Sequence, residues 1–416
     1  MRSKLTRTVR DGGAALTAAL LAWTAPALHA QTVVGTTAPE EVGLSADVLD
    51  RIGPAVEGLL EGGRTGGVLT LVARHGEVAH LEARGERTPG AALAVDDIFR
   101  IYSMTKPVTS VAAMILVEDG RLSLDDPVAR HLPAFADVQV WDGGTLRPPS
   151  TPMTVRHLLS HTSGLTYGIF GNTPVDSMYV RELRGLSGRS GRDLAATVDV
   201  IASLPLVADP GARWNYSVST DVLGRIVEVV SGRPLDVFFR EELFEPLGMG
   251  ETSFEVPASE RHRLVSMYAS GDGPARPVES EEDGTRSDWL SGGGGLYSTA
   301  ADYFRFAQML LNEGRLDDVR ILEPATVREM RRNHLPDALI PIGPAWPDAG
   351  FGLGFAVGMT EQPSNFFWLG MANTYFWIDP DDDLVVFGWT QLLPTFATPL
   401  DRLMRPIVYE ALRAGN

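Results

Sequence analysis

The stretch IYSMTKP at residues 101–107 decides both the fold and the chemistry of this chain. It is followed at residues 108–117 by VTSVAAMILV, an apolar run of helical length. Residues three positions apart share one face of a helix, so Ser103 and Lys106 are predicted to stand side by side on its first turn. Helix N-termini favour negative charge, and burial lowers the pKa of a lysine. The pattern therefore predicts a serine with a basic amine beside it.

Lys106 stands in a chain that otherwise uses arginine for its cations. The sequence holds 34 arginines and two lysines, the other lysine being Lys4 near the N-terminus. Arginine keeps its proton, whereas a lysine with a lowered pKa can act as a base. We therefore interpret Lys106 as a chemically required amine. The alternative is that one lysine has survived by chance.

Other kinds of site lack their signatures in this sequence. It contains no G-x-S-x-G, no H-E-x-x-H and no cysteine. The lack of cysteine excludes a thiolate nucleophile and disulfides, and the other two absences leave an α/β-hydrolase nucleophile elbow and a zinc site unsupported. The glycine run 292–295 is interpreted as a place where backbones pass closely, and not as a dinucleotide site. No metal and no cofactor are expected.

The N-terminal segment suggests an exported protein, and the overall charge bears on its partners. Residues 1–30 combine a basic start, the apolar run GAALTAALLAW and small residues, which is typical of a signal peptide cleaved after Ala27 or Ala30. An uncleaved amphipathic helix is the alternative. The run is short for a bilayer and no later stretch is longer, so we expect a periplasmic or secreted protein without stable membrane insertion. The formal net charge of −17 argues against a nucleic-acid partner.

Strand patterns occur near both ends of the chain, and helical patterns fill the middle. We predict strands at 68–73, 78–83, 374–379 and 384–390, and helices at 300–312 and 400–414, with Ser45 capping an earlier helix. The expected fold class is α/β (α+β), with one antiparallel sheet assembled from both termini. Residues 31–118 and 287–416 would form the sheet domain, and residues 119–286 an inserted all-helical domain.

Several further stretches resemble the serine β-lactamase and penicillin-binding-protein superfamily. Within it the chain is similar to the family VIII carboxylesterases, which are like class C β-lactamases. The stretches are TVRHLLSHTSGLTYG at 154–168, WNYSVSTDVLGRIVE at 214–228, EPLGM at 245–249, SGGGGLYSTAADYFRF at 291–306 and WLGMANTYFWIDP at 368–380. The resemblance covers nearly all of the chain after the signal peptide. It implies a sheet flanked by helices, an all-helical domain, and an active site between them.

The resemblance also implies roles for individual residues. Ser103 would be the nucleophile of the S-x-x-K motif and Lys106 its base. Tyr216 matches the tyrosine of the family's second motif, where a phenol beside an ammonium can sit deprotonated and relay a proton to the leaving group. A buried packing tyrosine is the alternative there. The oxyanion hole would pair the backbone N–H groups of Ser103 and Met371. His161 lies in a loop that looks structural in the family, so it is not expected to be a catalytic base.

The residues expected to contact the substrate favour esters over β-lactams. These residues are Tyr102, Val218, Trp368 and Gly370. Trp368 stands where β-lactamases and peptidases of this superfamily carry a cation for the substrate carboxylate, and Val218 stands where β-lactamases carry an asparagine. With Phe366 and Phe367 nearby, the site is expected to be apolar, which suits neutral short-chain esters.

Other functions stay open at this point. One is a β-lactamase or a peptidase acting on D-amino acids (a DD-peptidase). Another is a non-catalytic penicillin-binding-like protein, although Ser103, Lys106 and Tyr216 are all present. Acyl transfer and lactone hydrolysis are the remaining alternatives. Leu369 and Asn373 differ from the glycines that the esterases often carry, which bears on the shape of the pocket.

Overall fold

The computed structural model describes residues 35–183, 191–278, 284–360, 364–398 and 400–415. By its internal contacts, the segment 32–416 forms one compact unit, and everything below concerns this unit. The expected signal peptide lies outside the described residues, so it stays a prediction. The domain division at residues 118 and 286 also stays a prediction. No helix in the described part of the chain is long and apolar enough to cross a membrane.

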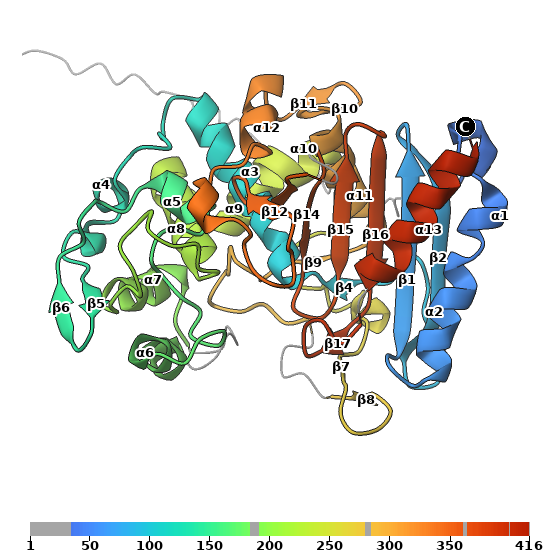
Figure 1. Cartoon of the computed structure of the whole chain (residues 1–416), viewed down its shortest axis with the longest axis horizontal. Coiled ribbons are helices and arrows are strands. Elements are labelled where there is room, and N and C mark those ends of the chain that lie inside the picture. The colour runs from blue at the N-terminus through green and yellow to red at the C-terminus, as the bar shows by residue number, and fades with distance from the viewer. Residues whose placement is uncertain (1–34, 184–190, 279–283, 361–363, 399, 416) are drawn as a thin grey trace, which may run out of the picture. The chain divides into compact units, whose positions relative to one another are not determined.

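An antiparallel sheet of eight strands, counted over the described residues, forms the centre of the fold (Figure 1). Its order is β12-β13-β14-β15-β16-β1-β2-β3. The strands are β1 (Gly67–Arg74), β2 (Glu77–Thr88), β3 (Ala91–Ala92), β12 (Ala349–Phe351), β13 (Ala356–Gly358), β14 (Phe366–Leu369), β15 (Tyr375–Asp379) and β16 (Leu384–Trp389). β1 pairs with β16, where Leu71 lies opposite Phe387, so the sheet is assembled from both ends of the chain as predicted.

Helices pack on both faces of this sheet, which explains why its central strands β1, β15 and β16 are buried almost throughout. Successive side chains of a strand point to opposite faces. On β15, Phe376 packs against Tyr303 of α11 (Ala300–Leu311), with 5.5 Å between ring centroids. The next residue, Trp377, lies on the other face. Its ring centroid is 4.7 Å from the guanidinium carbon of Arg405 in α13 (Leu400–Gly415).

The middle of the chain contains several helices separated by loops and a few short strands, so it is not all-helical as expected. Its helices are α4 (Val128–His131), α5 (Val155–Leu159), α6 (Pro174–Leu183), α7 (Leu194–Ala202), α8 (Ser219–Ser231), α9 (Leu235–Phe239) and α10 (Glu245–Leu247). Helix α8 packs against α3 (Thr105–Glu118), which carries Lys106. Shorter elements complete the fold: α12 (Pro324–Met330) and the strands β4 (Phe99–Arg100), β5 (Val140–Asp142), β6 (Thr145–Arg147), β7 (Tyr268–Ala269), β8 (Arg276–Pro277), β9 (Tyr297–Ser298), β10 (Arg315–Leu316), β11 (Val319–Arg320) and β17 (Leu392–Leu393).

Two local predictions differ from the structure. The first helical region is split into α1 (Ala46–Leu49) and α2 (Ile52–Glu61), and the Ser45 side chain makes no capping hydrogen bond. Ser103 lies in a 3₁₀ turn, Tyr102–Met104, and the α-helix begins only at Thr105. Tyr102 has a φ of 44°, an uncommon value for a residue with a side chain. The tight turn keeps Ser103 beside Lys106 while it ends the preceding extended segment.

Candidate active site

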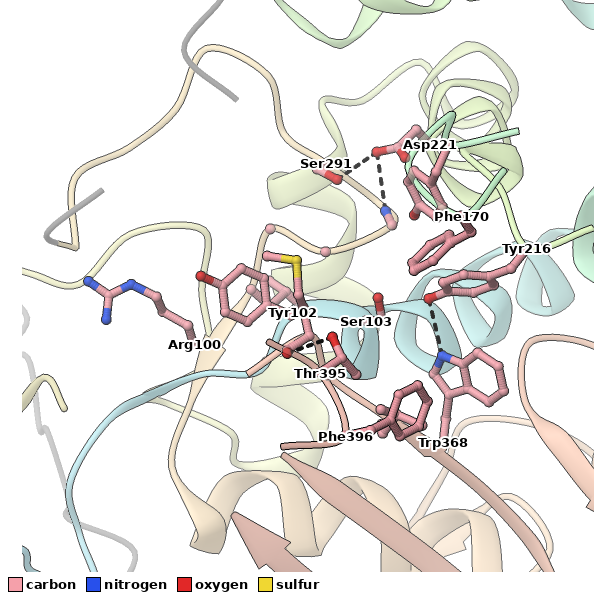
Figure 2. A pocket seen from close by; sticks show the side chains of 18 of the residues that line it. Arg100, Tyr102, Ser103, Phe170, Tyr216, Asp221, Ser291, Trp368, Thr395 and Phe396 are labelled. Atoms are coloured by element: carbon pink, nitrogen blue, oxygen red, sulfur yellow. Dashed lines mark hydrogen bonds between the residues drawn. The ribbon is translucent and has the colours of Figure 1, made fainter. Parts of the chain in front are cut away.

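A cavity of about 550 Å³ opens where the start of α3 meets three other parts of the chain. These are the turn before α8, the glycine run after Ser291, and the end of β14. Figure 2 shows Ser103 at the centre of this cavity, with Tyr102 on one side and Tyr216 on the other. Of the predicted site residues, Tyr102, Ser103, Tyr216, Trp368, Gly370 and Met371 line the cavity.

Lys106 lies behind the cavity wall, where its side chain is fully buried. Its Nζ is 3.1 Å from Ser103 Oγ, 2.6 Å from the carbonyl oxygen of Gly293 and 2.9 Å from the hydroxyl of Tyr167. Desolvation lowers the pKa of Lys106 to about 7, although the carboxylate of Asp221 acts in the opposite direction. A neutral amine can donate to Gly293 and Tyr167 and keep its lone pair for the proton of Ser103.

Burial favours the protonated form of Tyr216, whereas the family resemblance implied a deprotonated phenol. Burial raises its pKa above the ordinary tyrosine value, and interactions with Ser103 and Trp368 offset this only in part. Trp368 Nε1 donates to the Tyr216 hydroxyl at 3.3 Å. Lys106 Nζ lies over the Tyr216 ring, 4.7 Å from its centroid, and the phenol hydroxyl to which it donates is that of Tyr167. The phenol therefore stays protonated near neutral pH.

A buried carboxylate organises the loop that receives the lysine. Asp221, in the first turn of α8, accepts a hydrogen bond from Ser291 Oγ at 2.6 Å and one from the Gly293 backbone N–H at 3.2 Å. A Cβ at Gly293 would lie 2.6 Å from Asp221 Oδ2 and 2.9 Å from the Tyr167 hydroxyl. A Cβ at Gly292 would lie 2.8 Å from the carbonyl oxygen of Thr220. The close backbone approach predicted for the glycine run is confirmed.

Gly370 is required by the protein's own packing. A Cβ there would collide with Thr374 Oγ1 and with the carbonyl oxygen of Ile101, which precedes the nucleophile turn. Thr395 Oγ1 donates to the carbonyl oxygen of Met371 at 2.9 Å and so fixes the next residue beside the cavity. The oxyanion role of the Ser103 and Met371 backbone N–H groups stays a prediction.

The sequence interpretation assigned three apolar side chains to the site that the structure places elsewhere. Val218 is fully buried where α8 begins, and it does not line the cavity. Phe366 packs against Phe355 with 4.8 Å between ring centroids. Phe367 points to the opposite face of the sheet, where its centroid is 5.5 Å from the guanidinium carbon of Arg405. Neither phenylalanine is among the lining residues.

The apolar character of the cavity comes from other side chains, which sequence reasoning missed. Phe170, Trp214, Trp346 and Phe396 all line it. They belong to segments outside helices and strands, so no periodicity marks them. Tyr167, which accepts a hydrogen bond from Lys106, is the last residue but one of the stretch 154–168. Its place in that stretch could have identified it as a site residue.

His161 has the structural surroundings that we expected. It is fully buried, its ring centroid is 4.8 Å from that of Tyr216, and its Nδ1 lies 3.3 Å from Ser217 Oγ. Burial holds the pKa of His161 well below the usual value, and the nearby Lys106 acts in the same direction. It supports the Tyr216 ring from behind and is not among the residues that line the cavity.

Comparison with known proteins gives consistent matches over most of the chain. Residues 54–408 match the family model described as Beta-lactamase. An uncharacterized protein of Mycobacterium tuberculosis is 35% identical over 369 residues, covering 83% of this chain and 90% of the relative. Esterase EstB of Burkholderia gladioli is 31% identical over 407 residues, covering 88% and 96%. The solved structure of EstCE1, a hydrolase with promiscuous acyltransferase activity, matches with a TM-score of 0.76 and 29% identity, covering 87% of this chain and 99% of EstCE1.

Proposed function

Because the chain belongs to the β-lactamase family, we propose that it is a serine hydrolase that cleaves short-chain carboxylic esters through an acyl-enzyme on Ser103. One observation carries the proposal. A fully buried amine with a pKa of about 7 lies 3.1 Å from a serine hydroxyl on the wall of an apolar cavity. A lowered pKa next to a hydroxyl is what activation of a serine nucleophile requires.

In the acylation step, Lys106 accepts the proton of Ser103 while Oγ forms a bond to the ester carbonyl carbon. The carbonyl oxygen becomes an oxyanion, for which we assign the backbone N–H groups of Ser103 and Met371 as donors. When the tetrahedral intermediate collapses, the bond to the alkoxy oxygen breaks and Tyr216 donates its proton to that oxygen. The alcohol therefore leaves neutral, the acyl group stays on Ser103, and the ammonium of Lys106 and the phenolate of Tyr216 balance each other in charge.

In the deacylation step, water takes the place of the alcohol and the same groups act in reverse order. Water gives a proton to the Tyr216 phenolate, and its oxygen forms a bond to the acyl carbon. The bond to Ser103 Oγ then breaks, and Oγ regains a proton from the Lys106 ammonium, which lies 3.1 Å away. The carboxylic acid leaves, and the site returns to its starting protonation state.

The lining of the cavity favours neutral esters. At position 368 a tryptophan stands beside Tyr216, and its indole N–H is directed to the phenol instead of to a substrate carboxylate. Arg100 also lines the cavity, but it is buried and donates to the carbonyl oxygen of Val265 at 3.0 Å. The names of EstB, an esterase, and EstCE1, a hydrolase, agree with this choice.

The test replaces the nucleophile. In Ser103→Ala we expect loss of covalent labelling by a fluorophosphonate, and hydrolysis of p-nitrophenyl butyrate below about a hundredth of the wild-type rate. Ser203→Ala, at the exposed serine that follows the last residue of α7, is the matched control and should keep both properties. Retained labelling of Ser103→Ala would overturn the assignment of Ser103 as the nucleophile. A higher kcat/KM for penicillin G than for the ester would replace the esterase function with that of a β-lactamase.

We further propose that the protein is exported, on the basis of residues 1–30 of its sequence. Cell fractionation of the full chain and of a chain lacking residues 2–30 tests this. The full chain should reach the periplasm or the medium with its N-terminus cut after Ala27 or Ala30. Equal distribution of the two chains would overturn the proposal.

A further inference from the structure

A row of aromatic rings runs along one side of the candidate active site (Figure 2). Phe170 lies 5.8 Å from Tyr216 between ring centroids, and Tyr216 lies 5.2 Å from Trp368. Trp346 stacks on Trp368 at 5.3 Å, and Phe396 meets Trp346 edge to face at 5.5 Å. All five rings line the cavity, and we refer to them as the aromatic row.

The two ends of the aromatic row are exposed to solvent. The side chains of Phe170 and Phe396 are 64% and 56% exposed. They belong to loops far apart in the sequence, one after the stretch 154–168 and one before α13. Neither ring is needed to fill the core, so their place at the rim of one cavity indicates a surface that an apolar ligand covers.

The position of Tyr216 shows which half of an ester would lie on these rings. Its protonated hydroxyl interacts with Ser103, so it is the group placed to protonate the leaving oxygen. The substituent on that oxygen then extends from the Tyr216 hydroxyl towards Trp368 and its neighbours. The acyl chain takes the opposite side of Ser103, where Tyr102 lies (Figure 2).

We propose that the aromatic row binds the alcohol half of the substrate, and that the preferred substrates are esters of alcohols that carry a planar apolar ring. This inference rests on the proposed function and names its substrate class. Ring centroids 5 to 6 Å apart leave the outer faces and edges of Phe170, Trp346 and Phe396 available for the edge and offset contacts that aromatic groups prefer. A short acyl chain with a small alcohol would leave much of a cavity of about 550 Å³ unfilled.

Two isomeric esters test the orientation directly. Benzyl propanoate carries its ring on the alcohol side, and ethyl phenylacetate carries the same ring on the acyl side. Each kcat/KM, measured by pH-stat titration of the released acid, is divided by the rate constant for alkaline hydrolysis of the same ester, which removes differences in intrinsic reactivity. We expect benzyl propanoate to be preferred by about tenfold. Equal or reversed values would overturn the inference.

Variants at the exposed ends of the row give a second test. In Phe170→Leu/Phe396→Leu we expect the ratio of kcat/KM for benzyl propanoate over ethyl phenylacetate to fall by about threefold or more. Because both esters are measured on one protein, a general loss of folded enzyme cancels. Leu146→Ala, at an exposed apolar side chain outside the cavity, is the control and should keep the ratio. An unchanged ratio in the double variant would overturn the inference.

Ethyl propanoate distinguishes a failure of the aromatic row from a failure of the proposed function. Turnover of ethyl propanoate without a preference between the isomers would overturn the role of the aromatic row alone. If the wild-type protein hydrolyses none of the three esters nor p-nitrophenyl butyrate, the proposed function itself is overturned.

Discussion

The two sides of Ser103 differ sharply in what surrounds them. On the inner side, Lys106 is fully buried and bonded to Tyr167 and Gly293, with Asp221 behind the loop. On the outer side, aromatic rings from Phe170 to Phe396 border an open cavity. The inner side is closed and polar, whereas the outer side is open and largely apolar.

This difference teaches how one serine can serve two demands. A lysine becomes a base near neutral pH only if water is kept from its ammonium form, which requires burial. A substrate must enter and leave, which requires an opening. The fold separates the two by placing the amine behind the nucleophile turn and the substrate surface in front of it.

The largest effect is expected when the amine on the inner side is replaced by a group that cannot act as a base. In Lys106→Arg we expect kcat to fall at least about a thousandfold, because a guanidinium keeps its proton in the working pH range. Ester hydrolysis and circular dichroism of both proteins measure activity and folding. An arginine variant within tenfold of the wild-type rate would show that Lys106 is not the base.

A rescue experiment covers the case in which arginine does not fit the buried site. The sequence contains no cysteine, so the thiol of Lys106→Cys would be unique. Alkylation of the unfolded variant with 2-bromoethylamine, followed by refolding, restores an amine at nearly the lysine length. Activity should return only in the alkylated protein, and wild-type protein taken through the same steps is the control.

The second largest effect on activity is expected when Tyr216, the proton donor to the leaving group, is replaced. In Tyr216→Phe we expect kcat/KM for ethyl butyrate to fall by about a hundredfold, because ethoxide needs a proton to leave. The loss should be much smaller for p-nitrophenyl butyrate, whose leaving group is stable as an anion. Trp368→Phe removes the same 3.3 Å hydrogen bond but keeps the phenol, so it should show no such dependence on the leaving group.

The smallest of the three effects concerns the carboxylate behind the base. Asp221 raises the pKa of Lys106, so in Asp221→Asn that pKa should fall further below its present value of about 7. Activity requires the neutral amine, so the rise of kcat/KM with pH should move to lower pH. The plateau should also fall by about tenfold, since a weaker base transfers protons less effectively. Lys106 faces Ser103, Tyr167 and the Tyr216 ring, none of which carries a charge near neutral pH.

Asp302→Asn is the matched control for this pH profile. Asp302 is likewise buried and likewise accepts from a backbone N–H and a hydroxyl, those of Glu251 and Thr252. It does not line the cavity. The apparent pKa should therefore not move in this variant, and a shift of the Asp221→Asn profile towards higher pH would contradict the assigned electrostatics.

Much of the fold was predictable because it depends on local patterns. The hairpin at 68–83, the strand pair at 374–390 and the helix at 300–312 all follow from apolar runs broken by turn residues. The side-by-side placement of Ser103 and Lys106 follows from their spacing of three, and the 3.1 Å separation agrees with it. These are properties of a segment and its immediate neighbours.

The missed parts of the site depend on contacts between distant segments. Phe367 and Trp368 are adjacent in sequence, yet one faces Arg405 and the other faces the cavity. Val218 follows the site tyrosine by two residues, but the start of α8 turns it into the core. The protonation of Tyr216 depends on burial by segments that meet only in the folded chain. No spacing rule in one segment contains this information.

The burial of Lys106 has a consequence for how the molecule meets amine-reactive reagents. In residues 35–416 it is the single lysine, and its side chain has no exposed surface. An acylating label that modifies any amine in an unfolded chain therefore finds no exposed side-chain amine in the described part of this one. Lys106 can be modified only when the region around α3 opens. The labelling rate of its Nζ atom therefore reports local unfolding of that region. The lysine that would act as base is thus also a chemical probe of whether this region is folded.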